Sequence, residues 1–147
     1  MYFKKHIVLF LFGILIAGVQ LSAQQLAGIT FIGNSLGVKT LTTSEVLEYY
    51  KARRNLWPSN KAVIACLPPS KTQEATDVCA KIYGKSVAEV QKFWLSEVFK
   101  GRSRSPYFAL SDEDLLEYVS STPGAIGAFI NERNLAIPQE LQLQIKP

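Results

Sequence analysis

The chain has almost no histidine: the only one among its 147 residues is His6, close to the N-terminus. Serine-hydrolase triads, cysteine–histidine proteases and histidine general bases all need an imidazole, so these enzyme classes are excluded for the rest of the chain. Zinc held by histidine is excluded for the same reason, and two cysteines alone do not complete a tetrahedral zinc site. No paired acidic residues at a recognisable spacing take over these roles. We therefore expect a protein that is not an enzyme and that holds no cofactor and no metal.

Long apolar runs are also lacking, with one exception at the N-terminus. Residues 7–19, "IVLFLFGILIAGV", follow the basic residues Lys4 and Lys5 and precede "QLSA". This layout is typical of a secretory signal peptide, here residues 1–23 with cleavage after Ala23, and it predicts a periplasmic or secreted protein. A membrane anchor is the competing interpretation. A spanning helix needs about 20 apolar residues, however, so we expect the mature protein not to span a membrane.

The chain that follows the leader has no strong excess of charge of one sign. Without residues 1–23, the count of lysine plus arginine falls from 16 to 14, against 12 acidic residues. Such a nearly balanced chain lacks the basic face that marks most nucleic-acid binders, so we expect no nucleic-acid partner. Residues 24–147 have the length of a single domain with its own core.

Cysteine is scarce as well, since Cys66 and Cys79 are the only two. An exported chain lies in a compartment that permits disulfides, and the even count favours a bridge. A bridge would close a loop of roughly 15 residues and would stabilise the fold by about 3 kcal/mol in the chain-entropy model. Two buried free thiols are the alternative that the sequence leaves open.

Strand-like and helix-like segments alternate along residues 24–147. Short apolar runs bounded by glycine or proline predict strands, and apolar residues at helical spacing behind a serine or threonine cap predict helices. Expected strands are 26–33, 61–69 and 122–130, with a short one within 134–147; expected helices are 40–54, 70–83, 86–99 and 111–121. The alternation predicts an α/β domain with some parallel strand pairing.

Helix-start signals mark each of the expected helices. Thr42 with Glu45, Ser70 with Gln73, and Ser86 with Glu89 fit capping boxes, and Ser111 precedes the acidic residues 112–114. The segment "PPSKTQEA" has a second interpretation. Ser70, Lys71 and Thr72 could hold a small anion, because free N–H groups and the positive dipole end converge at a helix start. A plain helix cap and a weak anion site both remain open.

Four segments of the chain occur in a characteristic order: "LTTSEVLEYYKARRNLWPSNKAVIACLPPS", "KIYGKS", "FWLSEVFKG" and "STPGAIGAF". In this order they resemble one lobe of phosphate-type substrate-binding proteins of ABC transporters. The resemblance covers most of residues 40–130, and "STPGAIGAF" is its most specific piece. It implies a single lobe similar to a type II periplasmic binding protein, with a mixed sheet flanked by helices. By the same resemblance, the function would be to bind a small oxyanion such as phosphate for an ABC permease or a sensor.

In the phosphate-binding members, a Ser-Gly-Thr helix start follows the second strand, and an arginine precedes its serine by four residues. Ser70 and Thr72 correspond to the serine and threonine, Lys71 replaces the glycine, and Cys66 takes the arginine's place. Lys71 hinders the close backbone approach that glycine permits, and the bidentate arginine contact is lost. The resemblance implies two lobes in complete members, of which we expect this chain to hold one.

A different class of function stays open beside oxyanion binding. The chain would then be a ligand-free interaction module of the cell envelope that derives from one binding-protein lobe. Lys100, Arg102 and Arg104 form the densest basic stretch, residues 100–106, which either docks an acidic envelope protein or is a solvated loop. A homodimer would favour ligand binding, because two copies could rebuild a two-sided cleft.

Overall fold

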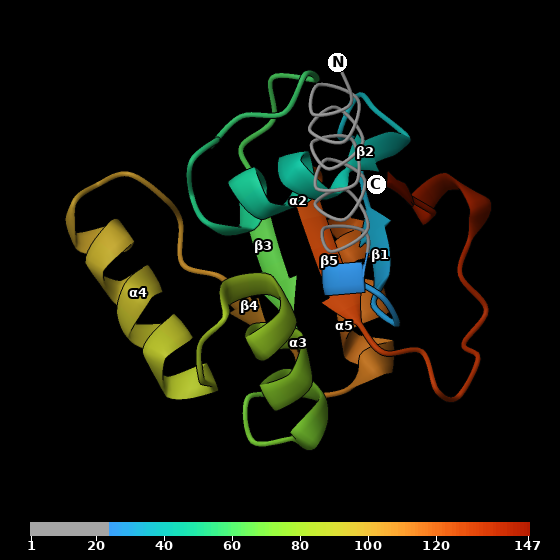
Figure 1. The fold of residues 1–147 in the computed structure, drawn as a ribbon. Coiled ribbons are helices and arrows are strands. Elements are labelled where there is room, and N and C mark those ends of the chain that lie inside the picture. Colours follow the sequence, from blue (N-terminus) through green and yellow to red (C-terminus); the bar gives the residue numbers. More distant parts are fainter. Residues whose placement is uncertain (1–23) are drawn as a thin grey trace, which may run out of the picture.

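A computed structural model describes residues 24–147, so the expected signal peptide lies outside the described residues. Its centre is a mixed sheet of four strands in the order β1 (Thr30–Gly33), β5 (Ala125–Phe129), β3 (Ile64–Leu67) and β4 (Tyr107–Phe108) (Figure 1). Strand β3 runs parallel to both β4 and β5, whereas β1 pairs with β5 in the antiparallel direction. No helix within residues 24–147 has the length and apolar character needed to cross a membrane.

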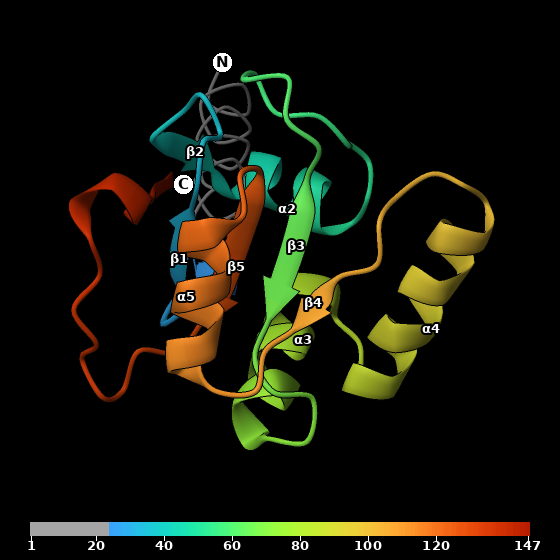
Figure 2. The same cartoon turned by 180° about the vertical axis from the view of Figure 1, so that it is seen from behind.

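Helices cover both faces of this sheet. Helices α2 (Thr43–Tyr50) and α3 (Gln73–Tyr83) lie on one face, and α5 (Asp112–Ser121) lies on the other (Figures 1 and 2). Helix α4 (Val87–Phe99) packs against α3 at the side of the molecule. The architecture is the expected α/β arrangement of a mixed sheet flanked by helices.

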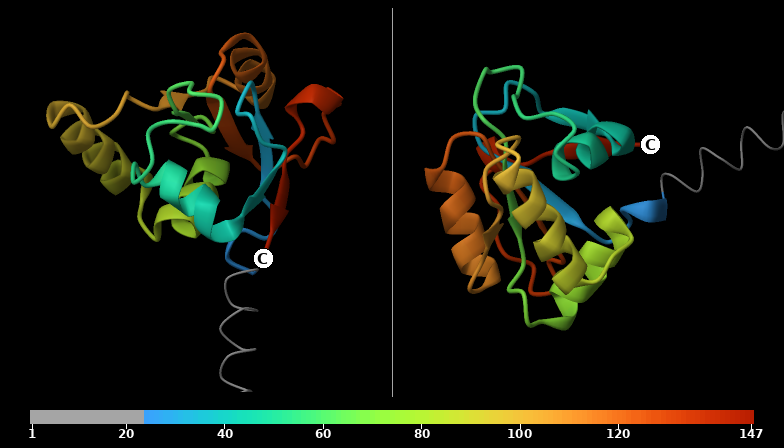
Figure 3. Two further views of the ribbon diagram at one scale, coloured as in Figure 1. Left: turned by 90° about the horizontal axis from the view of Figure 1, so that it is seen from above. Right: turned by 90° about the vertical axis from the view of Figure 1, so that its left-hand side faces the viewer.

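The C-terminal segment returns to the start of α2. After a 3-10 turn at Gln139–Leu141, strand β6 (Gln144–Lys146) pairs in parallel with β2 (Thr40–Thr42), which leads directly into α2. The views in Figure 3 show this segment passing along the β1 side of the sheet. The expected short strand near the C-terminus is thereby confirmed.

Side chains of the sheet alternate between two apolar clusters because successive residues of a strand point to opposite faces. Ala65 and Leu67 of β3 face α2 and α3, whereas Ile64 and Cys66 face α5. Strand β5 is buried at every residue and contributes to both clusters. Its burial on both faces explains why "AIGAF" is apolar throughout rather than alternating.

Most of the predicted helix starts are confirmed. Thr42 and Glu45 form a complete capping box, in which each side chain bonds the other's backbone N–H. The hydroxyls of Ser86 and Ser111 cap α4 and α5. Gly84 ends α3 in the left-handed conformation at a φ of 64°, where a residue without Cβ is favoured. The first strand is shorter than expected and begins at Thr30.

The predicted cap of α3 is wrong by two residues. The helix begins at Gln73, and Thr72, not Ser70, is its N-cap: the Thr72 Oγ1 accepts a hydrogen bond from the Ala75 N–H at 3.2 Å. Ser70 and Lys71 instead form a turn that follows Pro69. The Thr72 N–H closes this turn on the Pro69 carbonyl at 3.0 Å, so the chain needs two more residues before it can enter the helix.

The predicted disulfide is not formed: Cys66 and Cys79 are both buried free cysteines. Cys66 points to the α5 face of the sheet, whereas Cys79 lies on α3 at the opposite face. The sheet itself therefore separates the two thiols. Burial raises the pKa of Cys66 to about 12 and that of Cys79 to about 11, which keeps both as unreactive thiols at neutral pH.

The two hydroxyls at the start of α3 should differ in their effect on stability. We expect Thr72→Ala to lower the free energy of unfolding by about 1 kcal/mol, because it removes the cap. Ser70→Ala should change it by less than about 0.5 kcal/mol, as is usual for a side chain without a structural partner. Urea unfolding followed by circular dichroism measures both. Equal losses in the two variants would contradict the assignment of Thr72 as the cap.

The separation of the cysteines predicts a thiol count. The purified, unreduced protein should show two reactive thiols per chain in denaturant and almost none when folded, because both side chains are buried. A thiol-specific chromogenic reagent gives both numbers. Loss of the two thiols in the denatured, unreduced sample would mean that the bridge forms after all.

Candidate anion site at the carboxyl edge of the sheet

The parallel strands β3, β4 and β5 end at one edge of the sheet, which we call the carboxyl edge. Helix α3 starts here after β3, and α5 starts here after β4 (Figure 2). The two helices then run on opposite faces of the sheet. Such a reversal is the topological switch point at which open α/β sheets bind ligands, so this edge is the place to look for a site.

Ser70, Lys71 and Thr72 lie together at this edge, immediately before α3. The Thr72 hydroxyl is already engaged, because it donates to the Pro69 carbonyl at 2.7 Å and accepts from the Ala75 N–H. Lys71 is exposed and makes no ion pair within residues 24–147. The three residues thus offer the Ser70 hydroxyl, one ammonium group and the positive end of α3 to an anion.

Cys66 occupies the position at which the resemblance would place an arginine, and it contributes no anion-binding group to the carboxyl edge. Its side chain is buried in the cluster beneath α5 rather than directed to the carboxyl edge. The site therefore has no bidentate cation from β3. Only Lys71 supplies positive charge from the turn, and an ammonium binds an anion as a point charge.

Acidic side chains lie close to the same helix start. The Glu74 Oε1 accepts a hydrogen bond from the Ile130 N–H at 2.6 Å, which joins the first turn of α3 to the segment that follows β5. Partial burial raises the pKa of Glu74, and the nearby carboxylates of Asp112 and Glu132 raise it further. These three carboxylates come from three separate segments, and their charge opposes an anion at this edge.

The start of α5 is satisfied by its own side chains. The Ser111 hydroxyl accepts from the Asp114 N–H at 3.0 Å, and the Asp114 Oδ2 accepts from the Leu110 N–H at 2.8 Å and the Tyr107 hydroxyl at 2.7 Å. The bonds from Leu110 and Tyr107 lower the pKa of Asp114, and the bond to Asp114 raises the pKa of Tyr107 to about 12. The acidic residues 112–114 lie in the first turn of α5, where their charge complements the positive end of the helix. No cluster of metal-binding side chains occurs in residues 24–147.

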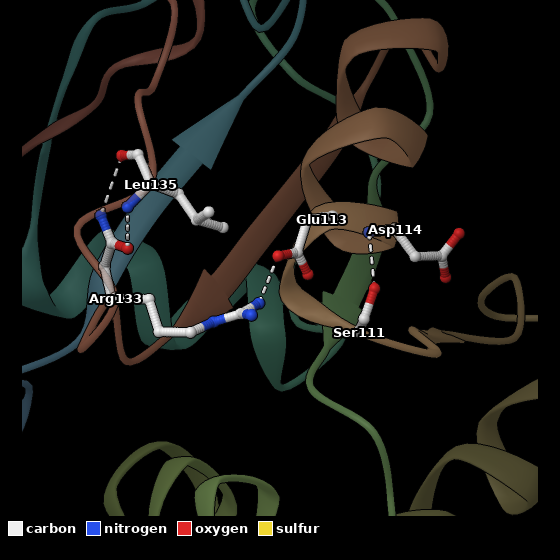
Figure 4. Close-up of polar contacts among 6 residues, drawn as sticks. Ser111, Glu113, Asp114, Arg133 and Leu135 are labelled. Carbon is white, nitrogen blue, oxygen red and sulfur yellow. Dashed lines mark hydrogen bonds and ion pairs between the residues drawn. The ribbon is translucent and has the colours of Figure 1, made fainter.

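The loop after β5 contributes one arginine, but a carboxylate neutralises it. Figure 4 shows Arg133 reaching across to Glu113 in the first turn of α5, with which it forms an ion pair. Asn131 orders the same loop, because its side chain bonds both the N–H and the carbonyl of Leu135. Sequence reasoning did not single out Glu74 or Arg133. The only signal for Glu74 was its place in the first turn of a helix.

Comparisons with known proteins agree with the fold. No protein-family model matches the chain, and no curated protein matches it. Its structure is similar to the crystal structure of an ABC-type phosphate transport receptor from Vibrio cholerae, with a TM-score of 0.56 and 13% sequence identity. The similarity covers 80% of this chain and 46% of that receptor, so the chain spans about half of the receptor's length. The likeness shows a periplasmic-binding-protein-like fold, consistent with a single lobe.

The raised pKa of Glu74 predicts how stability depends on pH. Its folded pKa lies above the ordinary 4.5, so the folded state keeps a proton that the unfolded chain has already lost. The resulting stability is fully present below pH 4.5 and is lost as the pH rises through the folded pKa. We expect Glu74→Gln to remove this step, because the amide stays neutral and its oxygen still accepts from Ile130.

Urea unfolding at several pH values between acid and neutral measures this effect. Glu89→Gln is the matched control, since it removes a first-turn carboxylate from α4 instead and should leave the step in place. A pH profile that is the same in Glu74→Gln as in the unchanged protein would contradict this prediction.

Proposed function

We propose that residues 24–147 form a single binding domain of the periplasm, exported by a leader at 1–23, that binds a small oxyanion for an ABC permease. Phosphate is the anion that we favour. The observation that carries the proposal is the meeting of the α3 and α5 starts at the switch point of a binding-protein-like sheet. Likeness to a phosphate transport receptor supports the choice of ligand.

Ser70, Lys71 and Thr72 are the residues that we assign to the anion. The Ser70 hydroxyl and Lys71 ammonium would contact it directly, and Thr72 would fix the helix start that presents them. Glu74 and its acidic neighbours work against binding, and the site is open to water. Affinity should therefore be weak, in the millimolar range, and should fall as salt screens the ammonium.

Calorimetric titration of phosphate, then sulfate, into the chain from Gln24 onward tests this proposal. We expect saturable heat at low salt that is lost in Ser70→Ala and in Lys71→Ala. Glu74→Gln should strengthen binding several-fold because it removes a repelling charge, whereas Lys85→Ala, just beyond the other end of α3, should have no effect. Absence of saturable heat up to about 50 mM phosphate, well above a millimolar dissociation constant, or equal loss in Lys85→Ala, would refute it.

A second candidate is an envelope interaction module without a small ligand. Two observations favour it: the carboxylates at the carboxyl edge, and the exposed apolar side chains Leu95, Val98 and Phe99 on α4. Analytical ultracentrifugation at micromolar protein concentration gives the oligomeric state, which helps to distinguish oxyanion binding from the interaction module. A homodimer would provide the second half of a ligand cleft, whereas a monomer that binds no phosphate favours the interaction module.

A further inference from the structure

A cavity lies at the opposite edge of the sheet, far from the start of α3. It has a volume of about 340 Å³ and opens between the loop that leads into β3 and the loop that leads into β4. These loops precede their strands, so the cavity lies at the amino edge of the sheet. The buried aromatic residues Tyr49 and Trp94 belong to its lining.

Arginine side chains give this cavity its charge. Arg54, Arg102 and Arg104 line it, and its lining contains no acidic residue. Arg54 is held in place by an ion pair with Glu48 at 2.6 Å and by its position 5.7 Å from the centre of the Tyr49 ring. Arg102 and Arg104 are exposed and form no ion pair within the described residues 24–147. Two cations are therefore available to an anionic partner.

The two loops are joined, so the arginines project from ordered backbone. The Asn55 side chain donates a hydrogen bond to the Arg102 carbonyl at 2.9 Å, and the Arg102 N–H continues the end of α4 by bonding the Glu97 carbonyl at 3.0 Å. Residues 101–104 therefore form one wall of the cavity.

Exposed apolar side chains occur in the cavity lining and on the helix that borders the cavity. Leu56, in the lining, is 57% exposed. Helix α4 contributes Trp94 to the lining, and its Leu95 and Phe99, one turn apart, are 59% and 83% exposed. Helix α4 stands at the outer margin of the molecule in Figure 1 and faces the viewer in the right panel of Figure 3. Apolar residues gathered beside arginines are characteristic of protein interfaces rather than of free surface.

We propose that this amino-edge surface docks an acidic segment of another envelope protein. An apolar side chain of the segment enters the cavity beside Leu56, and flanking carboxylates pair with Arg102 and Arg104. A free small anion would need the arginines but not the apolar residues beside them. The cavity is concave and large enough for one or two side chains of a peptide. Its shape suits such side chains better than it suits contact with the flat surface of a lipid membrane. The proposal is independent of the oxyanion site, because the two sites share no residue.

A pair of labelled peptides tests the proposal on the chain from Gln24. The acidic probe is dansyl-Asp-Glu-Phe-Asp-Glu-amide, and the neutral probe is dansyl-Asn-Gln-Phe-Asn-Gln-amide. Fluorescence anisotropy should show saturable binding of the acidic peptide at low salt, at least about tenfold tighter than the neutral one, and weakening towards 1 M salt as charges are screened.

Variants assign the binding to this surface. The double change Arg102→Ser with Arg104→Ser should weaken acidic-peptide binding at least about tenfold, and Phe99→Ser should weaken it as well. Lys85→Ser with Lys146→Ser removes the same charge from exposed positions outside both the cavity and α4, and it should leave binding unchanged. Circular dichroism and urea unfolding establish that every variant folds.

Several outcomes would overturn the proposal. One is that the acidic peptide shows no saturable binding. Another is that the neutral peptide binds equally tightly. A third is that the lysine control variant loses as much acidic-peptide binding as the arginine double variant. Binding to phosphatidylglycerol vesicles without binding to the peptide would assign the surface to lipid instead. Self-association that the arginine double variant abolishes would assign it to a second copy. The phosphate site is tested separately: Lys71→Ala should keep peptide binding, and the arginine double variant should keep phosphate binding.

Discussion

The fold depends on how closely the chain can pack around strand β5. Gly124, just before it, has a φ of 88°, and a Cβ there would collide with the Ala62 carbonyl oxygen. The Gly124 carbonyl accepts the Trp57 indole N–H at 2.8 Å, which holds the loop before β3 against the turn. Within the strand, a Cβ at Gly127 would come within 2.7 Å of a Leu115 methyl group, so a side chain there would force Leu115 of α5 to move. Both helical layers are positioned by this one strand.

Strand order then separates two edges of different charge. The carboxyl edge collects Glu74, Asp112 and Glu132 beside two helix starts, whereas the amino edge collects the arginines of residues 54, 102 and 104. The chain is close to neutral beyond its leader, so this polarity comes from arrangement rather than from composition. A charge count along the sequence averages the two edges and conceals both of them.

Local signals in the sequence predicted most of the elements, and contacts between distant segments account for what it missed. The capping pattern located α2, α4 and α5, because a cap involves residues only three apart. The same pattern placed the start of α3 at Ser70, because it does not reveal the turn between Pro69 and Thr72 that precedes the helix. The disulfide failed for a related reason: separation along the chain does not reveal that Cys66 and Cys79 lie on opposite faces of a sheet. Glu74 beside Glu132, and Arg54 beside Arg102, are likewise pairs that only the fold brings together.

The distribution of charge bears on which edge recognises an anion. At the carboxyl edge, the positive ends of α3 and α5 already face carboxylates of the chain itself, and Arg133 is paired with Glu113. A free oxyanion loses translational and rotational freedom when it binds, whereas these carboxylates are already part of the chain. The oxyanion must therefore compete with them at a disadvantage. At the amino edge, Arg102 and Arg104 face no such competitor among the residues that line the cavity. In this chain, two exposed arginines without a carboxylate among their cavity neighbours therefore lie at the edge away from the switch point, where they are accessible to an acidic partner.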